Sequence, residues 1–164
     1  MRASEPAVRP ATLTDVGSLV RLRIANAVAH LALDPATYRI PEEEAVRRHF
    51  AAVLTEGSEG HAVLVAEVDG RVVGMVEVVR SSGPPDHQIL RPEPSAQIHT
   101  VVAEEARGRG VGSALLTAAE QWAAAAGIAY LSAGIHHRNA GAVRFYSRYG
   151  YAGSGLSLGR RVTT

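Results

Sequence analysis

The chain has 164 residues, of which 46% are hydrophobic and 20% charged, and it contains no cysteine. This length and composition are typical of one globular domain, so we expect a single domain over residues 1–164. With 17 basic and 16 acidic residues the formal net charge is +1, which provides no overall field for binding nucleic acid. The lack of cysteine excludes disulfides, thiol nucleophiles and cysteine-based zinc sites.

The sequence carries no recognisable targeting or membrane segment. The first ten residues contain no apolar run of the kind found in secretory signals, and no stretch approaches about 18 consecutive apolar residues. We therefore expect a cytoplasmic protein with neither a membrane nor a nucleic acid as its partner.

The first 60 residues predict a short strand followed by two helices. The strand is expected at residues 7–10, and apolar residues at helical spacing then predict a helix over residues 16–29. A proline followed by three glutamates suits the first turn of a second helix, over residues 41–54. The link between the helices, residues 30–40, is either one wall of a pocket or a plain surface loop.

A β-hairpin is predicted in the middle of the chain. Two stretches rich in β-branched residues, His61–Val68 and Arg71–Arg80, flank an Asp-Gly pair, which favours a two-residue hairpin turn. Four prolines make residues 81–95 a long loop, and such loops tend to be functional or mobile. A further strand is predicted at residues 97–102.

Helix and strand signals alternate in the last third of the chain. Apolar residues recur at helical spacing from Val111 to Trp122, and Gly127 is a natural C-terminal cap for that helix. Asn139 suits the N-cap of a shorter helix. The elements expected here are a helix, a strand, a short helix and two short terminal strands, at residues 111–122, 128–134, 139–149, 151–154 and 156–162.

A glycine-rich segment separates the strand at residues 97–102 from the helix that follows. Its residues are Arg107, Gly108, Arg109, Gly110, Val111 and Gly112. Glycines let the main chain approach an anion, and the N–H groups and dipole of a helix start favour negative charge. A Walker loop is excluded, because no Gly-Lys-Ser/Thr ends the segment. The segment indicates a phosphate site, and the alternative is a plain turn with two solvated arginines.

Two motifs resemble the signatures of the Gcn5-related N-acetyltransferase (GNAT) superfamily. The pattern Arg-x-x-Gly-x-Gly within residues 107–112 is similar to the first signature, Gln/Arg-x-x-Gly-x-Gly/Ala. Residues 139–151 resemble the second, in which Asn begins a helix that contains Phe-Tyr and the segment closes at Gly-Tyr. Two motifs about 30 residues apart are more specific than either alone. The resemblance covers residues 67–151 well and the first 60 residues only through their helical layout.

The resemblance implies an α/β fold and a cosubstrate. Its sheet would be mixed, mostly antiparallel and twisted, with flanking helices and a splay between the fourth and fifth strands that receives the pantetheine of acetyl-CoA. The backbone of Val101, Val102 and Ala103 would pair with the pantetheine amides, and the backbone of residues 107–112 would hold the pyrophosphate. The residues that would contact the pantetheine arm from the other side are Asn139, Ala142 and Tyr146.

The implied reaction is transfer of the acetyl group to an amine of a small molecule, peptide or protein in a ternary complex. Tyr146 would serve as the general acid or stabilise the departing thiolate, unless it is a packed core tyrosine. Many family members carry a carboxylate on the fourth strand, but Ile98 stands where one would align. His99 is the substitute base by residue type, although strand alternation leaves its face open, and His136-His137 is a weaker candidate.

Several expectations concern ligands and partners. No metal is predicted, because the neighbouring histidines 136 and 137 lack His-x-His spacing. The acceptor amine is not readable from the sequence, but residues 30–40 and 81–95 would shape its pocket. Since relatives often pair, a homodimer is also expected. The alternative function, kept open by Ile98, is a non-catalytic module that binds or senses coenzyme A on the same fold.

Overall fold

The computed structural model describes residues 4–163. Residues 1–3, part of the stretch judged not to be a secretory signal, and residue 164 lie outside the described residues. The chain forms two compact units, a larger one that ends at Gly134 and a smaller one that begins at Ile135. The helices and strands, with two short 3-10 helices, are β1 (Ala7–Pro10), η1 (Leu13–Asp15), α1 (Val16–Leu33), α2 (Glu43–Glu56), β2 (His61–Val68), β3 (Arg71–Arg80), β4 (Ser95–Val102), η2 (Glu104–Ala106), α3 (Val111–Ala125), β5 (Tyr130–Ser132) and α4 (Ala140–Arg148).

The larger unit contains a five-stranded sheet in the order β1-β2-β3-β4-β5. The first three pairings are antiparallel and the β4–β5 pairing is parallel. Asp69 and Gly70 join β2 to β3 with φ angles of 51° and 74°, as a type I′ turn requires. The predicted hairpin and the mixed, mostly antiparallel fold class are both confirmed.

The sheet opens between its last two strands. β5 pairs with β4 only from Ser95, opposite Tyr130, to Gln97, opposite Ser132. β4 then continues to Val102, whereas β5 ends at Ser132. Within the described residues, the end of β4 at residues 98–102 therefore has no strand beside it on the β5 side.

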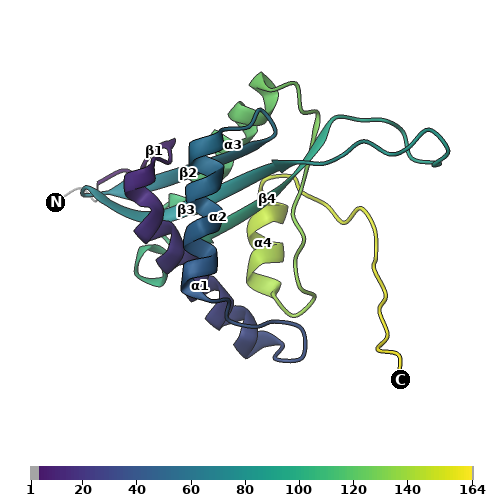
Figure 1. Cartoon of the computed structure of the whole chain (residues 1–164), viewed down its shortest axis with the longest axis horizontal. Coiled ribbons are helices and arrows are strands. Elements are labelled where there is room, and N and C mark those ends of the chain that lie inside the picture. Colours follow the sequence, from purple (N-terminus) through teal and green to yellow (C-terminus); the bar gives the residue numbers. More distant parts are fainter. Residues whose placement is uncertain (1–3, 164) are drawn as a thin grey trace. The chain divides into compact units, whose positions relative to one another are not determined.

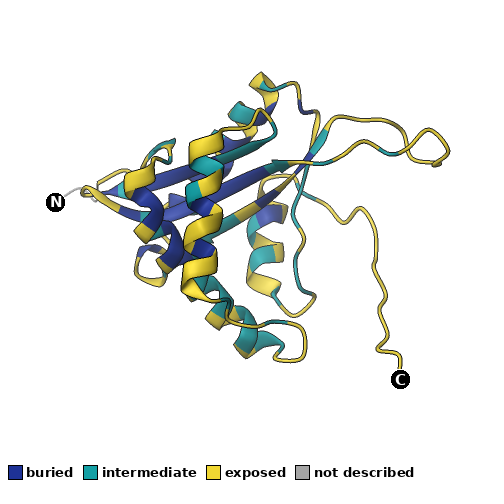
Figure 2. Cartoon of the chain, in the orientation of Figure 1, coloured by how far each residue is buried: buried dark blue, intermediate teal, exposed yellow. Residues whose placement is uncertain are grey.

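Helices cover both faces of this sheet. In Figure 1, α1 and α2 lie in front of the sheet and α3 lies behind it. Leu19 of α1 and Phe50 of α2 are fully buried and belong to one core cluster with Met75 of β3. On the opposite face α3 approaches closely, because a Cβ added at Gly74 would lie 2.9 Å from the Cγ1 atom of Val111. Figure 2 shows the buried residues concentrated on the strands and on the helix faces turned toward them.

The segment from Leu13 to Leu33 is long and apolar enough to span a membrane by length and composition. In the structure the apolar face of this segment packs in the protein core. Leu19 and Leu22 are 0% and 1% exposed and pack in the core cluster against the sheet. We therefore treat α1 as a core helix of the larger unit.

Several element boundaries differ from those predicted. α1 continues to Leu33, beyond the expected end near residue 29, and the Nδ1 atom of His30 lies 2.8 Å from the carbonyl oxygen of Asn26 one turn earlier. The link between α1 and α2 is correspondingly shorter than residues 30–40. β4 starts two residues early, at Ser95, and β5 is confined to Tyr130–Ser132.

The two terminal strands predicted at residues 151–154 and 156–162 are wrong. Among the described residues, none from 151 to 163 is in a strand. Leu156 and Leu158 are both 87% exposed, so the alternating apolar pattern there packs against no sheet face. Alternation predicts a strand only where a neighbouring strand is available to pair with it.

Candidate active site

The glycine-rich segment forms an open turn that leads into α3. Gly108 and Gly110 have φ angles of 71° and 79°, in the left-handed region that side chains other than glycine rarely adopt. A Cβ added at either position would meet no heavy atom within 4 Å. Glycine is therefore required by the backbone conformation and not by crowding, and the main chain is left accessible to a ligand.

The start of α3 offers backbone donors to an anion. Its first helical hydrogen bond runs from the N–H of Ala114 to the carbonyl of Gly110, at 3.0 Å, so the N–H groups of Val111 and Gly112 precede the hydrogen-bonded ladder. Val111 is 1% exposed, which fixes the position of this turn in the core. No acidic residue lies in the first turn of α3. With the dipole of the helix, this arrangement fits a phosphate group.

Two arginines add positive charge near this helix start. Arg107 and Arg109 are both exposed, so their guanidinium groups are accessible to a ligand. Glu104 and Glu105 of η2 precede them and are also exposed. The charges of these two arginines and two glutamates sum to zero, so the positive character of the site comes from the helix start and from any arginine that turns toward a ligand.

Along β4, the backbone N–H and carbonyl groups of successive residues point alternately toward β3 and toward the open side of the sheet. The N–H of Ala103 donates to the carbonyl of Val73 at 2.8 Å, and the carbonyl of Ala103 accepts from Ala106. Because antiparallel strands direct alternate residues to the same neighbour, Val101 also bonds toward β3, while Val102 points to the edge that β5 leaves uncovered. Of the three residues expected to pair with pantetheine, Val102 is therefore the one whose backbone N–H and carbonyl face the open edge, and the pairing itself stays a prediction.

The structure settles which face of β4 carries each candidate base position. Ile98 lies opposite Val78 and is 1% exposed, on the face of the sheet that α3 covers. His99 lies opposite Glu77, and directly opposite residues point to the same face. That face is the one covered by α1 and α2, because Val101, two residues further along, packs against their core cluster.

Glu77 gathers polar side chains from three other elements. Its Oε1 atom accepts a short hydrogen bond from Arg23 of α1. Its Oε2 atom lies 3.2 Å from the Nε2 atom of His49 of α2 and 2.7 Å from the Nε2 atom of His61 of β2. Glu77 itself is 4% exposed. This cluster was not predicted from the sequence, although one acidic residue within the apolar run of β3 was a signal for it.

Two pKa values are shifted around this carboxylate. Burial is the largest influence on the pKa of Glu77 and raises it, but the charge of Arg23 and the bonds from the two histidines outweigh burial, so the pKa is lowered. The pKa of His99 is lowered, first by desolvation and also by the charge of Arg23, while Glu77 opposes the shift. By its accessible surface His99 is exposed. His99 is therefore neutral at pH 7 and able to accept a proton.

The remaining expected site residues belong to the smaller unit and share one helix. Asn139 is the N-cap of α4, as predicted, and its Oδ1 atom accepts a hydrogen bond from the N–H of Ala142 at 3.2 Å. Tyr146 is 7% exposed. Its ring makes edge-to-face contacts with Phe145, at 5.1 Å between centroids, and with Tyr151, at 5.3 Å. The ring of Tyr146 is thus held in a fixed position within this unit.

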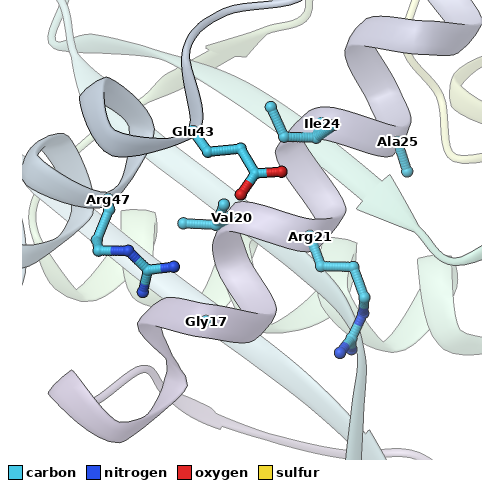
Figure 3. Close-up of a pocket in the computed structure, with 7 residues that line it drawn as sticks. All are labelled: Gly17, Val20, Arg21, Ile24, Ala25, Glu43 and Arg47. Atoms are coloured by element: carbon cyan, nitrogen blue, oxygen red, sulfur yellow. The ribbon is translucent and has the colours of Figure 1, made fainter.

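A separate pocket of about 390 Å³ lies between α1 and α2. Figure 3 shows Glu43 and Arg47 of α2 facing Val20 and Ile24 of α1. The pocket contains none of the residues that the sequence analysis expected at the site. The glycine-rich turn and the open edge of β4 therefore remain the better candidate site.

Comparison with known protein families gives one match. The model of the acetyltransferase (GNAT) family matches residues 25–151 of the chain. Among curated protein sequences, none matches the chain.

Solved structures share the fold over nearly the whole chain. A point mutant of the BH1408 protein from Bacillus halodurans has 19% identity and a TM-score of 0.85, covering 96% of this chain and 99% of its own. The aminoglycoside N-acetyltransferase AAC(6')-Iy in complex with CoA has 17% identity and a TM-score of 0.73, covering 99% and 98%. Glucosamine-6-phosphate N-acetyltransferase from Arabidopsis thaliana has 16% identity and a TM-score of 0.65, covering 96% and 99%. At these identities the likeness shows the fold alone.

Proposed function

The chain belongs to the acetyltransferase (GNAT) family, and we propose that it is an N-acetyltransferase that uses acetyl-CoA. One observation supports this proposal above the others. The uncovered edge of β4 is followed, after the short helix η2, by an open turn with two left-handed glycines and the start of α3. A ligand with an amide-bearing arm and a phosphate group suits such a strand edge followed by a helix start.

The binding of acetyl-CoA is assigned to two stretches of backbone. Val102 would pair with an amide of the pantetheine arm through its outward N–H and carbonyl. The N–H groups from Gly108 to Gly112 would hold the pyrophosphate, because the N–H of Arg107 already donates to the carbonyl of Glu104 at 3.2 Å. The side chains of Arg107 and Arg109 would add charge. From the family resemblance, the helix that carries Asn139 and Ala142 would contact the pantetheine arm.

Acetyl-CoA supplies an activated acetyl thioester, and the acceptor supplies an amine. In the proposed reaction the amine nitrogen forms a bond to the acetyl carbonyl carbon while the carbon–sulfur bond breaks. A primary amine is mostly protonated at pH 7, so it must lose a proton before it attacks. The coenzyme leaves as a thiolate, which takes up one proton, and the products are an amide and coenzyme A.

We assign proton removal from the amine to His99. Its lowered pKa keeps the imidazole neutral at pH 7, and it shares a sheet face with the buried Glu77. A carboxylate base at position 98 is not available, because Ile98 is a core residue. Direct transfer to the ring or transfer through a water molecule would both leave His99 with the proton.

Stabilisation of the departing thiolate is assigned to Tyr146. Its place in the second motif and its fixed ring support this role. A phenol with a pKa near 10 facing a thiol with a pKa near 8.5 is not driven to give up its proton completely. Its main contribution would therefore be a hydrogen bond to the sulfur.

The test is acetyl-CoA turnover by the purified protein with a panel of amines, followed by release of the free thiol and by mass spectrometry of the product. Aminoglycosides and glucosamine 6-phosphate belong in the panel because they are named for two structural relatives, together with peptides that have free amines. Thiol release matched by an acetylated amine is the expected result. Binding of acetyl-CoA with no transfer to any amine would instead favour the non-catalytic module.

Location and assembly stay predictions. We propose a cytoplasmic location, which the cysteine-free composition supports, since disulfides stabilise many secreted proteins. Near-neutral net charge supports the expectation of no nucleic-acid partner. The homodimer expected from the family resemblance would be tested by light scattering.

A further inference from the structure

The three side chains His49, His61 and Glu77 come from α2, β2 and β3 and meet at one point. Each contributes one atom that can bind a metal, and these atoms all lie within 4.8 Å of one another. We propose that they form a binding site for a divalent transition-metal ion such as Zn²⁺. This site goes beyond the proposed acetyl transfer and does not depend on it.

The distances between the donor atoms are close to those that a metal requires. In a tetrahedral zinc site the ligand atoms lie about 2.0 to 2.1 Å from the metal and hence about 3.4 Å from one another. The Oε2 atom of Glu77 lies 3.2 Å from the Nε2 atom of His49 and 2.7 Å from the Nε2 atom of His61. Small side-chain rotations would therefore place all three atoms around one ion, with the ion replacing the protons now shared between them.

The backbone holds these ligands in place before an ion binds. Glu77 pairs with Val63 across the β2–β3 ladder, so His61, two residues from Val63, points to the same face as Glu77. His49 is fixed by the next residue of α2, Phe50, which is fully buried in the core. Rigid elements supply all three ligands, so ion binding would order little additional chain.

The cluster is buried at one end and open at the other. The side chain of Glu77 is 5% exposed and that of His61 is 18% exposed, whereas that of His49 is 47% exposed. An ion could therefore enter from the side of His49, and water would complete its coordination there. Two histidines and one carboxylate with a fourth open position form a common zinc ligand set.

Arg23 influences the affinity of the proposed site for a metal ion. It holds the Oε1 atom of Glu77, which orients the carboxylate and leaves Oε2 for the ion. The positive charge of Arg23 balances the negative charge of the Glu77 carboxylate. The three ligands together with Arg23 are therefore neutral, as are the ligands of zinc sites made of three histidines. We therefore expect binding without the added attraction of an excess negative charge.

Sequence spacing could not reveal this site. The ligands lie at positions 49, 61 and 77, on a helix and two strands, and no short motif links them. The expectation that the chain binds no metal rested on the histidines at positions 136 and 137, whose rings stack on each other in the smaller unit. The proposed site uses different histidines.

The test is a titration of the tag-free protein with Co²⁺, followed by visible absorption, and with Zn²⁺, followed by calorimetry. We expect saturation at one ion per chain. His49→Ala and His61→Ala should each weaken binding by more than the roughly 10- to 100-fold typical of losing a residue that only supports a ligand. His87→Ala, which removes an exposed loop histidine, is the matched control and should bind like the wild type.

The melting temperature gives a second readout. Added Zn²⁺ should raise the melting temperature of the wild type and of His87→Ala but not of His49→Ala, a half-exposed position where the fold should be kept. No saturable binding, or equal binding by the wild type, His49→Ala and His61→Ala, would overturn the proposal.

Discussion

At the scale of single residues, the pKa of the proposed base His99 depends on its surroundings. Desolvation and Arg23 lower its pKa, and Glu77 partly restores it. The sequence identified His99 by residue type alone, and only the pairing of β4 with β3 shows that it faces the same side as Glu77.

His99→Ala should lower kcat/KM most near pH 7 and less at about pH 9 to 10, where more of the amine is already unprotonated. In the wild type the pKa of His99 is lowered, so this side chain is still mostly neutral at the ordinary histidine pKa of about 6.5. The acidic limb of the kcat/KM profile should therefore lie below about pH 6.5. Initial rates across this range check both statements. A loss that is equal at every pH would point to a packing role for His99.

Tyr146→Phe removes one hydroxyl while keeping the ring that packs on Phe145 and Tyr151. We expect kcat to fall by about 10- to 1,000-fold, equivalent to about 1.4 to 4 kcal/mol of transition-state stabilisation. Acetyl-CoA affinity and melting temperature should change little. Single-turnover rates with a confirmed acceptor provide the measurement, and an unchanged rate would show that Tyr146 only packs.

Asp15→Asn should destabilise the protein at pH 7. Asp15 is 5% exposed and accepts hydrogen bonds from Arg9 at 2.8 and 2.9 Å and from the N–H of Thr12 at 2.7 Å. The bond from Arg9 is the largest cause of its lowered pKa. Replacing the charged acceptor should cost about 1 to 3 kcal/mol of unfolding free energy, measured by urea denaturation.

The pH dependence of this loss provides its control. A carboxylate with a lowered folded pKa stabilises the fold above its unfolded pKa, and that contribution is lost as the pH falls through the folded pKa. The difference between the wild type and Asp15→Asn should therefore shrink in acid. Glu67→Gln, which removes the more exposed partner of Arg9, should cost less. A difference that persists unchanged in acid would exclude the ion pair as its source.

Secondary-structure elements were predictable where their signals are local. The Asp-Gly hairpin turn and the helix from Val111 depend on neighbouring residues, and both were predicted correctly. The short extent of β5 and the lack of terminal strands depend on pairing between distant segments, which periodicity does not encode. For the same reason Glu77 was missed, since its partners lie on elements far apart in sequence.

The contact between α3 and β3 positions the glycine-rich turn, and Gly74 makes that contact close. A Cβ at residue 74 would lie 2.9 Å from Val111, 3.0 Å from Leu115 and 3.2 Å from the carbonyl oxygen of Val101. Gly74→Ala should therefore push α3 away from the sheet and cost about 1 to 3 kcal/mol of unfolding free energy. Gly83→Ala is the matched control, because a Cβ there meets nothing within 4 Å. Equal stability of the two variants would show that the helix moves without cost.

For the molecule as a whole, the sequence predicted the family and the fold class but not the proposed acceptor. Family membership and fold class were predicted from two motifs in the sequence, and both predictions are confirmed. The proposed acceptor amine could not be identified, since its pocket would depend on loops whose conformation local signals do not specify. The central claim is that the start of α3 binds the pyrophosphate of acetyl-CoA.

Calorimetric titration of acetyl-CoA into the wild type and Gly112→Asp tests this claim most directly. An aspartate at this position would place a side chain and a negative charge against the proposed pyrophosphate site, yet a carboxylate near a helix N-terminus is compatible with folding. Thr117→Asp adds the same charge at an exposed position further along α3 and serves as the control. The account predicts that acetyl-CoA binding is lost in Gly112→Asp and kept in Thr117→Asp. Unchanged affinity in a folded Gly112→Asp protein would contradict it.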